Sequence, residues 1–255
     1  MKNPVKKKLL RGDKTVGAWL QLASPLTAEI MASAGFDWLM IDMEHAPGDI
    51  LTLVSQVQAI SSTDTVPFAR APWNDAVIIK RILDTGVAGV LIPSVNTPGE
   101  AEKAVSACKY PPQGNRGVAG SHRAAGFGQE AVSYLESAND ETLVITAIET
   151  PMAADNLVDI LSVQELDGIF IGPMDLASSM GHLGNPGHPE VQALISRIEE
   201  RVLDAGKILG TTTTPEHAKE KYDRGYQMLM LMSDSVSLAS LARKTISDFE
   251  RYTGN

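Results

Sequence analysis

Eight short apolar runs, separated by segments with helical spacing, constrain the fold of this chain more than any other feature. Most of the runs are continuously apolar rather than alternating, which is typical of parallel strands covered on both faces. We expect strands at Val16–Leu22, Trp38–Met43, Val66–Arg70, Gly89–Ile92, Leu143–Ile148, Gly168–Ile171, Ile208–Thr212 and Met228–Met232. Eight strand–helix units in 255 residues predict a (β/α)8 TIM barrel that spans residues 1–255 as a single domain.

Helix boundary signals support this alternation. Ser24-Pro25 and Thr97-Pro98 have the form of helix starts, and Gly35 follows a predicted helix end. A doubly wound sheet shares the same alternation and is the alternative fold. Against it, no GxGxxG motif follows the first run and the chain has no P-loop motif.

Residues 110–140 interrupt the rhythm between the fourth and fifth runs. Their first half is rich in proline and glycine, and a structureless loop of this length is usually functional or mobile. We expect an irregular loop over the barrel mouth there, followed by a helix at Gln129–Ala138.

The composition argues against several classes of function. The net charge of −9 disfavours nucleic acid as a partner, and the one basic cluster, Lys6–Arg11, is expected to be a solvated turn. No run approaches the ~18 continuous apolar residues of a membrane span, and no apolar segment follows the N-terminal lysines of a would-be signal peptide. The single cysteine, Cys108, suits a reducing compartment, so we expect a cytoplasmic protein that does not enter a membrane.

Ionisable residues follow four of the predicted strands at the point where each strand ends. They are Asp42, Glu44 and His45 after the second strand, Arg70 in the third, Glu149 after the fifth and Asp175 after the sixth. In a parallel barrel the carboxyl ends of all strands meet at one rim, where the active site lies. The pattern therefore predicts that these side chains converge.

Glu149 and Asp175 are the predicted metal ligands. Two carboxylates without a histidine or cysteine partner suit a hard cation such as Mg²⁺ or Mn²⁺. Taken singly, Glu149 could instead be an exposed loop acid, and Asp175 could cap the helix that begins at Leu176. The pair on adjacent strands favours the metal.

His45 and Arg70 are the predicted catalytic groups. Asp42 lies three residues before His45 and can orient its imidazole as a general base, whereas Asp84 could support His45 only through the fold or from a neighbouring subunit. Arg70 can clamp a carboxylate or stabilise an oxyanion. A rim salt bridge from Arg70 to Asp42 or Glu44 is the alternative, and it is compatible with that role.

The positions of the lysines argue against one mechanism. Schiff-base aldolases need a lysine near the active-site end of a strand, and none of the twelve lysines of this chain lies there. An enolate would therefore need a metal. The loops after the seventh and eighth strands also lack Lys and Arg, which disfavours a phosphorylated substrate.

Several motifs together resemble the HpcH/HpaI aldolases, which are class II pyruvate aldolases. The resemblance covers nearly the whole chain and rests on Asp42-Met43-Glu44-His45-Ala46-Pro47, Arg70, Ile148-Glu149-Thr150, Phe170–Leu176, Tyr110–Gly117 and Gly184-Asn185-Pro186. It implies metal-dependent aldol cleavage of a 4-hydroxy-2-oxo acid, through a chelated pyruvate enolate, to pyruvate and an aldehyde. Oxaloacetate decarboxylation, an acyl-CoA lyase reaction and a non-catalytic barrel are the alternatives.

The resemblance also implies roles for individual residues. Glu149 and Asp175 would hold Mg²⁺, Mn²⁺ or Co²⁺, and Arg70 would steady the enolate oxygen. His45 would act through water, supported by Asp42 and by Asp84 of a neighbouring subunit. The implied substrate-binding residues are Trp19, Glu44, Gly172, Met174 and Asp175.

A homohexamer is implied by the same resemblance. In it, the last helix, predicted at Ser235–Tyr252, would pack on a neighbouring subunit. This chain departs from the family pattern at Met43, Ala147 and Met174, which alter the walls of the pocket and leave the identity of the aldehyde open.

Overall fold

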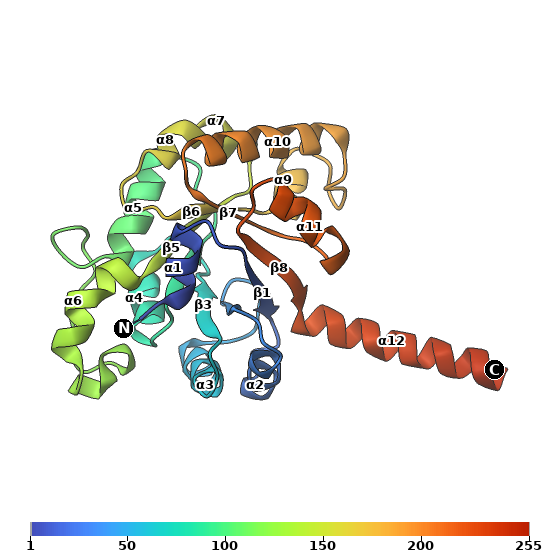
Figure 1. Cartoon of the computed structure of the whole chain (residues 1–255), viewed down its shortest axis with the longest axis horizontal. Coiled ribbons are helices and arrows are strands. Elements are labelled where there is room, and N and C mark those ends of the chain that lie inside the picture. The colour runs from blue at the N-terminus through green and yellow to red at the C-terminus, as the bar shows by residue number, and fades with distance from the viewer. Residues whose placement is uncertain (1, 255) are drawn as a thin grey trace.

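Eight parallel strands close into one barrel, with helices packed around it (Figure 1), as the sequence predicted. The computed structural model describes residues 2–254. The strands are β1 (Thr15–Leu20), β2 (Trp38–Asp42), β3 (Val66–Arg70), β4 (Gly89–Ile92), β5 (Leu143–Ile148), β6 (Gly168–Ile171), β7 (Ile208–Thr212) and β8 (Met228–Ser233). Each strand pairs with the next, and β8 pairs with β1.

Helices follow the strands in the alternating order that the sequence indicated. They are α1 (Pro4–Leu10), α2 (Pro25–Ser33), α3 (Ile50–Ile60), α4 (Ala76–Asp84), α5 (Pro98–Cys108), the 3₁₀ helix η1 (Arg123–Gly128), α6 (Ala131–Glu141), α7 (Pro151–Asp155), α8 (Leu157–Leu161), α9 (Pro173–Ser179), α10 (Pro189–Asp204), α11 (Pro215–Asp223) and α12 (Asp234–Thr253). The predicted start signals act as caps: the side chain of Ser24 accepts from the amide of Thr27, and Thr97 forms a capping box with Glu100.

Strand residues fill the space on both faces of the sheet. In β2, Trp38 and Met40 belong to the core inside the barrel, whereas Leu39 and Ile41 pack against the surrounding helices. This two-sided burial explains why the strands read as continuous apolar runs. A Cβ on Gly17 would lie 2.3 Å from the ring of Trp38, so glycine at this point of β1 makes room for the indole.

Helix α1 closes the N-terminal end of the barrel. Val5 and Leu9 join the inner core, and Lys6 is buried, with its Nζ 3.0 Å from Oδ1 of Asp167. The expectation of a solvated turn at Lys6–Arg11 is therefore wrong for Lys6. Its charge is paired inside the protein instead of exposed to water, which is how a buried ammonium is tolerated.

The insert between β4 and β5 lies at the N-terminal end of the barrel and does not cover the mouth, so that expectation is wrong. Nη2 of Arg116 lies 2.7 Å from Oδ1 of Asp84 at the end of α4, and Nη1 of Arg123 donates to the carbonyl of Thr85 at 2.7 Å. The reason is topological: the insert follows a helix, and helices of a β/α barrel run back toward the amino ends of the strands. The predicted helix appears as α6.

Helix α12 projects away from the barrel (Figure 1). Over its 20 residues only Asp234, at its start, is buried. Its exposed apolar side chains are Val236, Leu238, Leu241, Ile246, Phe249 and Tyr252. No helix within residues 2–254 is long and apolar enough to cross a membrane.

We predict that Gly17→Ala lowers the free energy of unfolding by roughly 1–3 kcal/mol, because the added methyl group overlaps the buried Trp38 ring and overpacks the barrel core. Urea denaturation measures this change. Gly99→Ala is the matched control, since nothing lies within 4 Å of a Cβ there and alanine favours the helix. Equal stability of the two variants would show that the barrel interior relaxes around the methyl group.

Candidate active site at the barrel mouth

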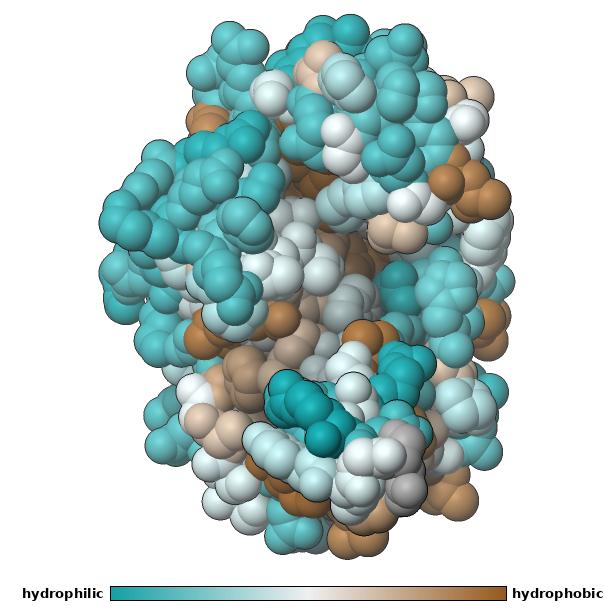
Figure 2. Space-filling view, turned by 90° about the vertical axis from the view of Figure 1, so that its right-hand side faces the viewer, coloured by the Kyte–Doolittle hydropathy of each residue, from teal (hydrophilic) through white to brown (hydrophobic). Residues whose placement is uncertain are grey.

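A cavity of about 620 Å³ opens at the carboxyl ends of the strands. Its walls include Trp19, Arg70, Glu149, Gly172, Met174 and Asp175. Figure 2 looks at the side from which α12 projects and shows a central hollow with pale and brown side chains at its floor and hydrophilic side chains around it. The only cationic side chain in the lining of this cavity is Arg70, and the lining contains no lysine.

Arg70 is held rigidly at the end of β3. Its Nε and Nη2 donate to the two carboxylate oxygens of Asp42 at 2.9 and 2.7 Å, and its Nη1 lies 3.1 Å from Oε2 of Glu44. The guanidinium also lies over the Trp19 ring, with its Cζ 4.3 Å from the ring centroid. The rim salt bridge considered from the sequence is thus present with both acids. It fixes the orientation of the guanidinium.

The two acids beside Arg70 differ in their electrostatics. Burial acts to raise the pKa of Asp42, but the hydrogen bonds and charge of Arg70 outweigh it, so the pKa of Asp42 lies below its ordinary value. For Glu44, burial dominates over the attraction of Arg70, and its pKa is raised. Asp42 is therefore the permanent anion that anchors the arginine.

Glu149 stands at the end of β5 beside the first turn of α9. The amide of Ser94 donates to its Oε2 at 3.2 Å. A Cβ at position 172 would lie 2.9 Å from the Cγ of Glu149, so Gly172 leaves the space that this side chain occupies. Burial raises the pKa of Glu149, the Ser94 amide lowers it, and the negative charges of Asp175 and Glu44 raise it further.

The acidic side chains that line the cavity are not balanced by a free positive charge there, which suits a bound cation. Glu149 and Asp175 both line the cavity and repel each other there, and Arg70 is already paired with Asp42 and Glu44. Carboxylate oxygens facing a water-accessible cavity are the ligands that hard divalent ions prefer. Glu149 and Asp175 are therefore the residues that would hold such an ion.

The capping alternative for Asp175 does not hold. Helix α9 begins at Pro173, earlier than expected, so Asp175 lies within its first turn. The cap position is Gly172, which has no side chain to accept from the helix. The carboxylate of Asp175 is thus free of the capping role that the sequence left open.

His45 lies at the edge of the site in a loop after β2. Its side chain is 63% exposed, and its Nε2 lies 3.7 Å from Oε2 of Glu44. Asp42 contacts only the backbone of His45, whose amide donates to its Oδ1 at 3.3 Å. The expectation that Asp42 orients the imidazole is therefore not met, because both oxygens of Asp42 are engaged by Arg70.

Asp84 lies outside this site within a single chain. It ends α4, at the opposite end of the barrel, and pairs with Arg116. The nearest histidine is His122, whose Nε2 lies 3.5 Å from its Oδ1. Any contact of Asp84 with His45 must come from another copy of the chain.

Gln21 is a site residue that the sequence reading missed. Its Nε2 donates to Oδ2 of Asp42 at 3.0 Å, and its Oε1 accepts from the hydroxyl of Ser233 at 2.7 Å. It thereby links the Asp42–Arg70 pair to the end of β8. The predicted first strand ran on to Leu22, which hid Gln21 inside a strand. A polar residue directly after Leu20 was the available signal.

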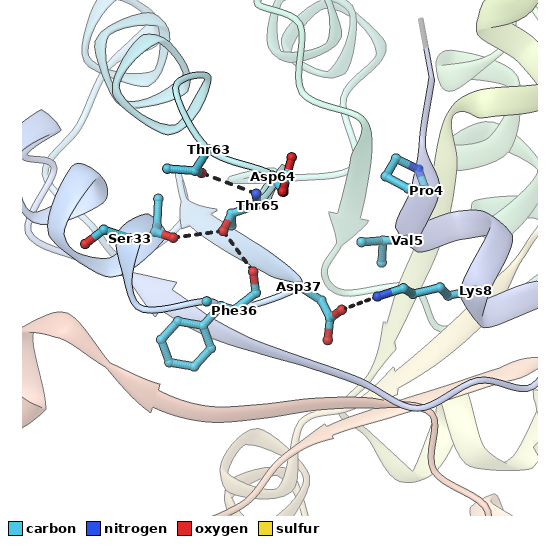
Figure 3. Close-up of a pocket in the computed structure, with 11 residues that line it drawn as sticks. Pro4, Val5, Lys8, Ser33, Phe36, Asp37, Thr63, Asp64 and Thr65 are labelled. Atoms are coloured by element: carbon cyan, nitrogen blue, oxygen red, sulfur yellow. Dashed lines mark hydrogen bonds and ion pairs between the residues drawn. The ribbon is translucent and has the colours of Figure 1, made fainter.

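A second depression, of about 640 Å³, lies at the opposite end of the barrel between α1 and the starts of β2 and β3. Figure 3 shows Lys8 paired with Asp37 and Thr65 bonded to neighbouring backbone and side-chain groups. Nζ of Lys8 donates to Oδ1 of Asp37 at 2.7 Å, and the hydroxyl of Thr65 donates to the carbonyl of Phe36 at 2.8 Å. These pairings leave no convergent set of reactive groups, so the candidate active site is the mouth.

The chain is similar in sequence to named aldolases over nearly its whole length. It is 42% identical over 250 residues to the 4-hydroxy-2-oxo-heptane-1,7-dioate aldolase of Shigella flexneri, covering 98% of this chain and 94% of that protein. It is also 42% identical over 248 residues to the hydroxypyruvate/pyruvate aldolase of Cupriavidus necator, covering 97% and 92% of the two chains.

A solved structure agrees with the sequence relatives. The crystal structure of an HpcH/HpaI aldolase/citrate lyase family protein from Burkholderia cenocepacia superposes with a TM-score of 0.93 at 35% identity, covering 98% of this chain and all of that one. The family model for HpcH/HpaI aldolase/citrate lyase matches residues 15–240. This protein therefore belongs to the HpcH/HpaI aldolase/citrate lyase family.

Proposed function

We propose that this protein cleaves 4-hydroxy-2-oxo acids to pyruvate and an aldehyde, with a divalent cation held by Glu149 and Asp175. The observation that carries the proposal is the pairing of two cavity-lining carboxylates with a rigidly held Arg70 in a mouth that has no lysine. Membership of the family and the aldolase relatives at 42% identity support the same reaction. They do not favour oxaloacetate decarboxylation or an acyl-CoA lyase reaction.

When bound, the cation would supply positive charge where an enolate of pyruvate develops. Mg²⁺, Mn²⁺ and Co²⁺ suit a site made of two carboxylates and water. The chain prepares this place with Gly172, whose missing side chain leaves room for Glu149. The first-turn amides of α9, at Met174 and Asp175, lack helical partners and are available to a substrate carboxylate.

Arg70 stabilises the charge that moves during cleavage. A guanidinium has five N–H donors, and Asp42 accepts from two of them, while Nη1 lies at ion-pair distance from Glu44. The donors that Asp42 does not engage are available to substrate oxygens in the cavity. When the C3–C4 bond breaks, its electron pair moves onto the C2 oxygen, and a fixed arginine there lowers the barrier without reorganising.

His45 handles the proton. Cleavage requires loss of the proton from the C4 hydroxyl, and protonation of C3 then gives pyruvate. The exposed imidazole of His45 lies beside Glu44 in the loop after β2, outside the lining of the cavity, and would exchange this proton through water. Trp19 forms the wall against which the substrate and Arg70 pack.

The functional particle is a homo-oligomer, and by family resemblance a hexamer. Helices in proteins are stabilised chiefly by packing an apolar face, and α12 leaves six large apolar side chains exposed, so it needs a surface to pack on. A neighbouring copy of the chain supplies that surface. The same assembly would bring Asp84 of one subunit to His45 of another.

Removal of metal is expected to abolish pyruvate release. Excess chelator should stop the cleavage of a panel of 4-hydroxy-2-oxo acids, and Mg²⁺, Mn²⁺ or Co²⁺ should restore it. Glu149→Gln should lose both activity and cation binding, because it removes a charged ligand. Glu102→Gln, on the exposed face of α5, is the control. Full activity in excess chelator would rule out the metal assignment.

Arg70→Lys is expected to lower kcat by roughly 10²–10³-fold, the usual loss when one donor to a developing oxyanion is removed. Lysine keeps a positive charge beside the buried Asp42, so the barrel should remain folded. Steady-state pyruvate release measures the loss, and circular dichroism checks the fold. Arg197→Lys, in an exposed ion pair with Asp155, serves as the control. A wild-type kcat in Arg70→Lys would contradict the clamp role.

Subunit mixing tests the shared site. His45→Ala and Asp84→Asn should each be impaired, but mixed oligomers should regain activity, because some sites then combine an intact His45 with an intact Asp84 from a neighbour. A mixture of His45→Ala with Arg70→Lys should not recover, since both groups belong to one chain's mouth. Sedimentation velocity gives the number of chains. Recovery in neither mixture would contradict the contribution of Asp84.

A further inference from the structure

Three metal-binding side chains cluster at the rim of the barrel, away from Glu149 and Asp175. They are His182 and His188, in the connection from α9 to α10, and Glu190, in the first turn of α10. One nitrogen of each ring and one carboxylate oxygen lie within 4.8 Å of one another. Neither histidine ends a strand, so the strand-end pattern did not single them out.

The contacts within the cluster hold its members together. Nε2 of His182 lies 2.9 Å from Oε2 of Glu190, and the rings of His182 and His188 stack with centroids 3.5 Å apart. Nδ1 of His188 accepts from the amide of Glu190 at the start of α10, which leaves Nε2 of His188 for an ion. The side chain of His182 is 22% exposed and that of Glu190 is 70% exposed, so the cluster is open to solvent.

The backbone fixes the two ends of this segment. The amide of His182 donates to the carbonyl of Ala177 at 2.8 Å, which ties it to α9. The amide of His188 donates to the carbonyl of Asn185 at 3.1 Å, and His188 caps α10. Gly181, directly before His182, and Gly184, between the two histidines, have positive φ angles of 82° and 74°, which glycine adopts without strain. The ligands are thus carried by a tight, hydrogen-bonded turn.

We propose that His182, His188 and Glu190 bind a borderline-soft divalent cation of the zinc type, as a second metal site distinct from the catalytic carboxylates. Two imidazoles and a carboxylate form a common three-ligand set for zinc, with water completing the tetrahedron. Nitrogen ligands favour Zn²⁺, Ni²⁺ or Cu²⁺ over Mg²⁺, whereas Glu149 and Asp175 offer only oxygen. The two sites therefore differ in the ions they select.

Binding requires a small rearrangement. A metal ion lies in the plane of each imidazole that ligates it, and the two stacked rings are nearly parallel, at 15°. One ring must turn so that both planes meet at the ion. Both rings are partly exposed, which leaves solvent-side space for this rotation. The stack should accordingly be lost when the metal binds.

The site would clamp the turn that borders the active-site mouth. Pro186 lies between the two histidines and lines the mouth cavity, and its carbonyl accepts from Nε2 of Gln192 at 2.8 Å. An ion that joins His182 to the first turn of α10 would connect the two ends of the segment that contains Pro186. Metal binding at the rim then restrains a wall of the active site without contacting the substrate.

Equilibrium dialysis against Zn²⁺ in a large excess of Mg²⁺ tests the proposal, with metal content measured on the intact oligomer. The wild-type protein should retain one zinc per chain at the rim, and so should Glu149→Gln, which lacks a catalytic ligand. The double variant His182→Ala/His188→Ala should lose that zinc. His217→Ala, an exposed histidine on α11, is the matched control and should behave as wild type.

A second measurement keeps the test independent of folding and of catalysis. Zinc should slow amide hydrogen exchange over residues 181–190 in the wild-type protein and in Glu149→Gln, but not in the double variant. Circular dichroism confirms that the double variant is folded. Zinc retention by the folded double variant, or no zinc retained by the wild-type protein, would overturn the proposal. Loss of zinc from Glu149→Gln alone would place the ion at the catalytic carboxylates and also overturn it.

Discussion

Pairing of β8 with β1 closes the sheet, and the position of every functional group depends on that closure. The register runs from Thr15 opposite Met228 and is interrupted between Gly17 and Trp19. Because all eight strands are parallel, closure brings their carboxyl ends to a single rim. Groups that are more than 100 positions apart in the chain, such as Arg70 and Asp175, thereby line one cavity.

The balance of charges at this rim explains why the acidic residues of the site have different roles. Asp42 is paired with Arg70, which it holds through two hydrogen bonds, and Glu44 lies at ion-pair distance from the same guanidinium. Glu149 and Asp175 remain without a cationic partner among the residues that line the cavity. One pair of acids thus orients the arginine, and the other pair attracts an ion. Gln21 bonds both to Asp42 and to Ser233, which directly precedes α12. The start of α12 and Arg70 therefore belong to one hydrogen-bonded network.

Some features of the fold and the site could be predicted from local sequence, and others could not. Strand positions followed from the apolar runs because both faces of each strand are buried, and Ser24 and Thr97 marked helix starts because they cap free amides. The insert was misplaced because its length suggested a lid, although the preceding helix had already returned the chain to the other end of the barrel. The pairing of Asp42 with Arg70 was expected only as an alternative, because nearness in sequence also favoured His45, whereas the register of β2 and β3 places Asp42 opposite Arg70.

The sequence by itself determined the order of strands and helices and the identity of the polar residues at the strand ends, since both depend on local hydrophobic periodicity and capping. It also indicated metal-dependent chemistry, because no lysine ends a strand. The tertiary structure decided which acid meets which base. It paired Asp42 with Arg70 and left Glu149 and Asp175 in the lining of the cavity. It also placed Asp84 away from the active-site mouth of the same chain and stacked His182 on His188. These outcomes depend on register, burial and competition for hydrogen bonds between segments distant in sequence, which no local pattern records.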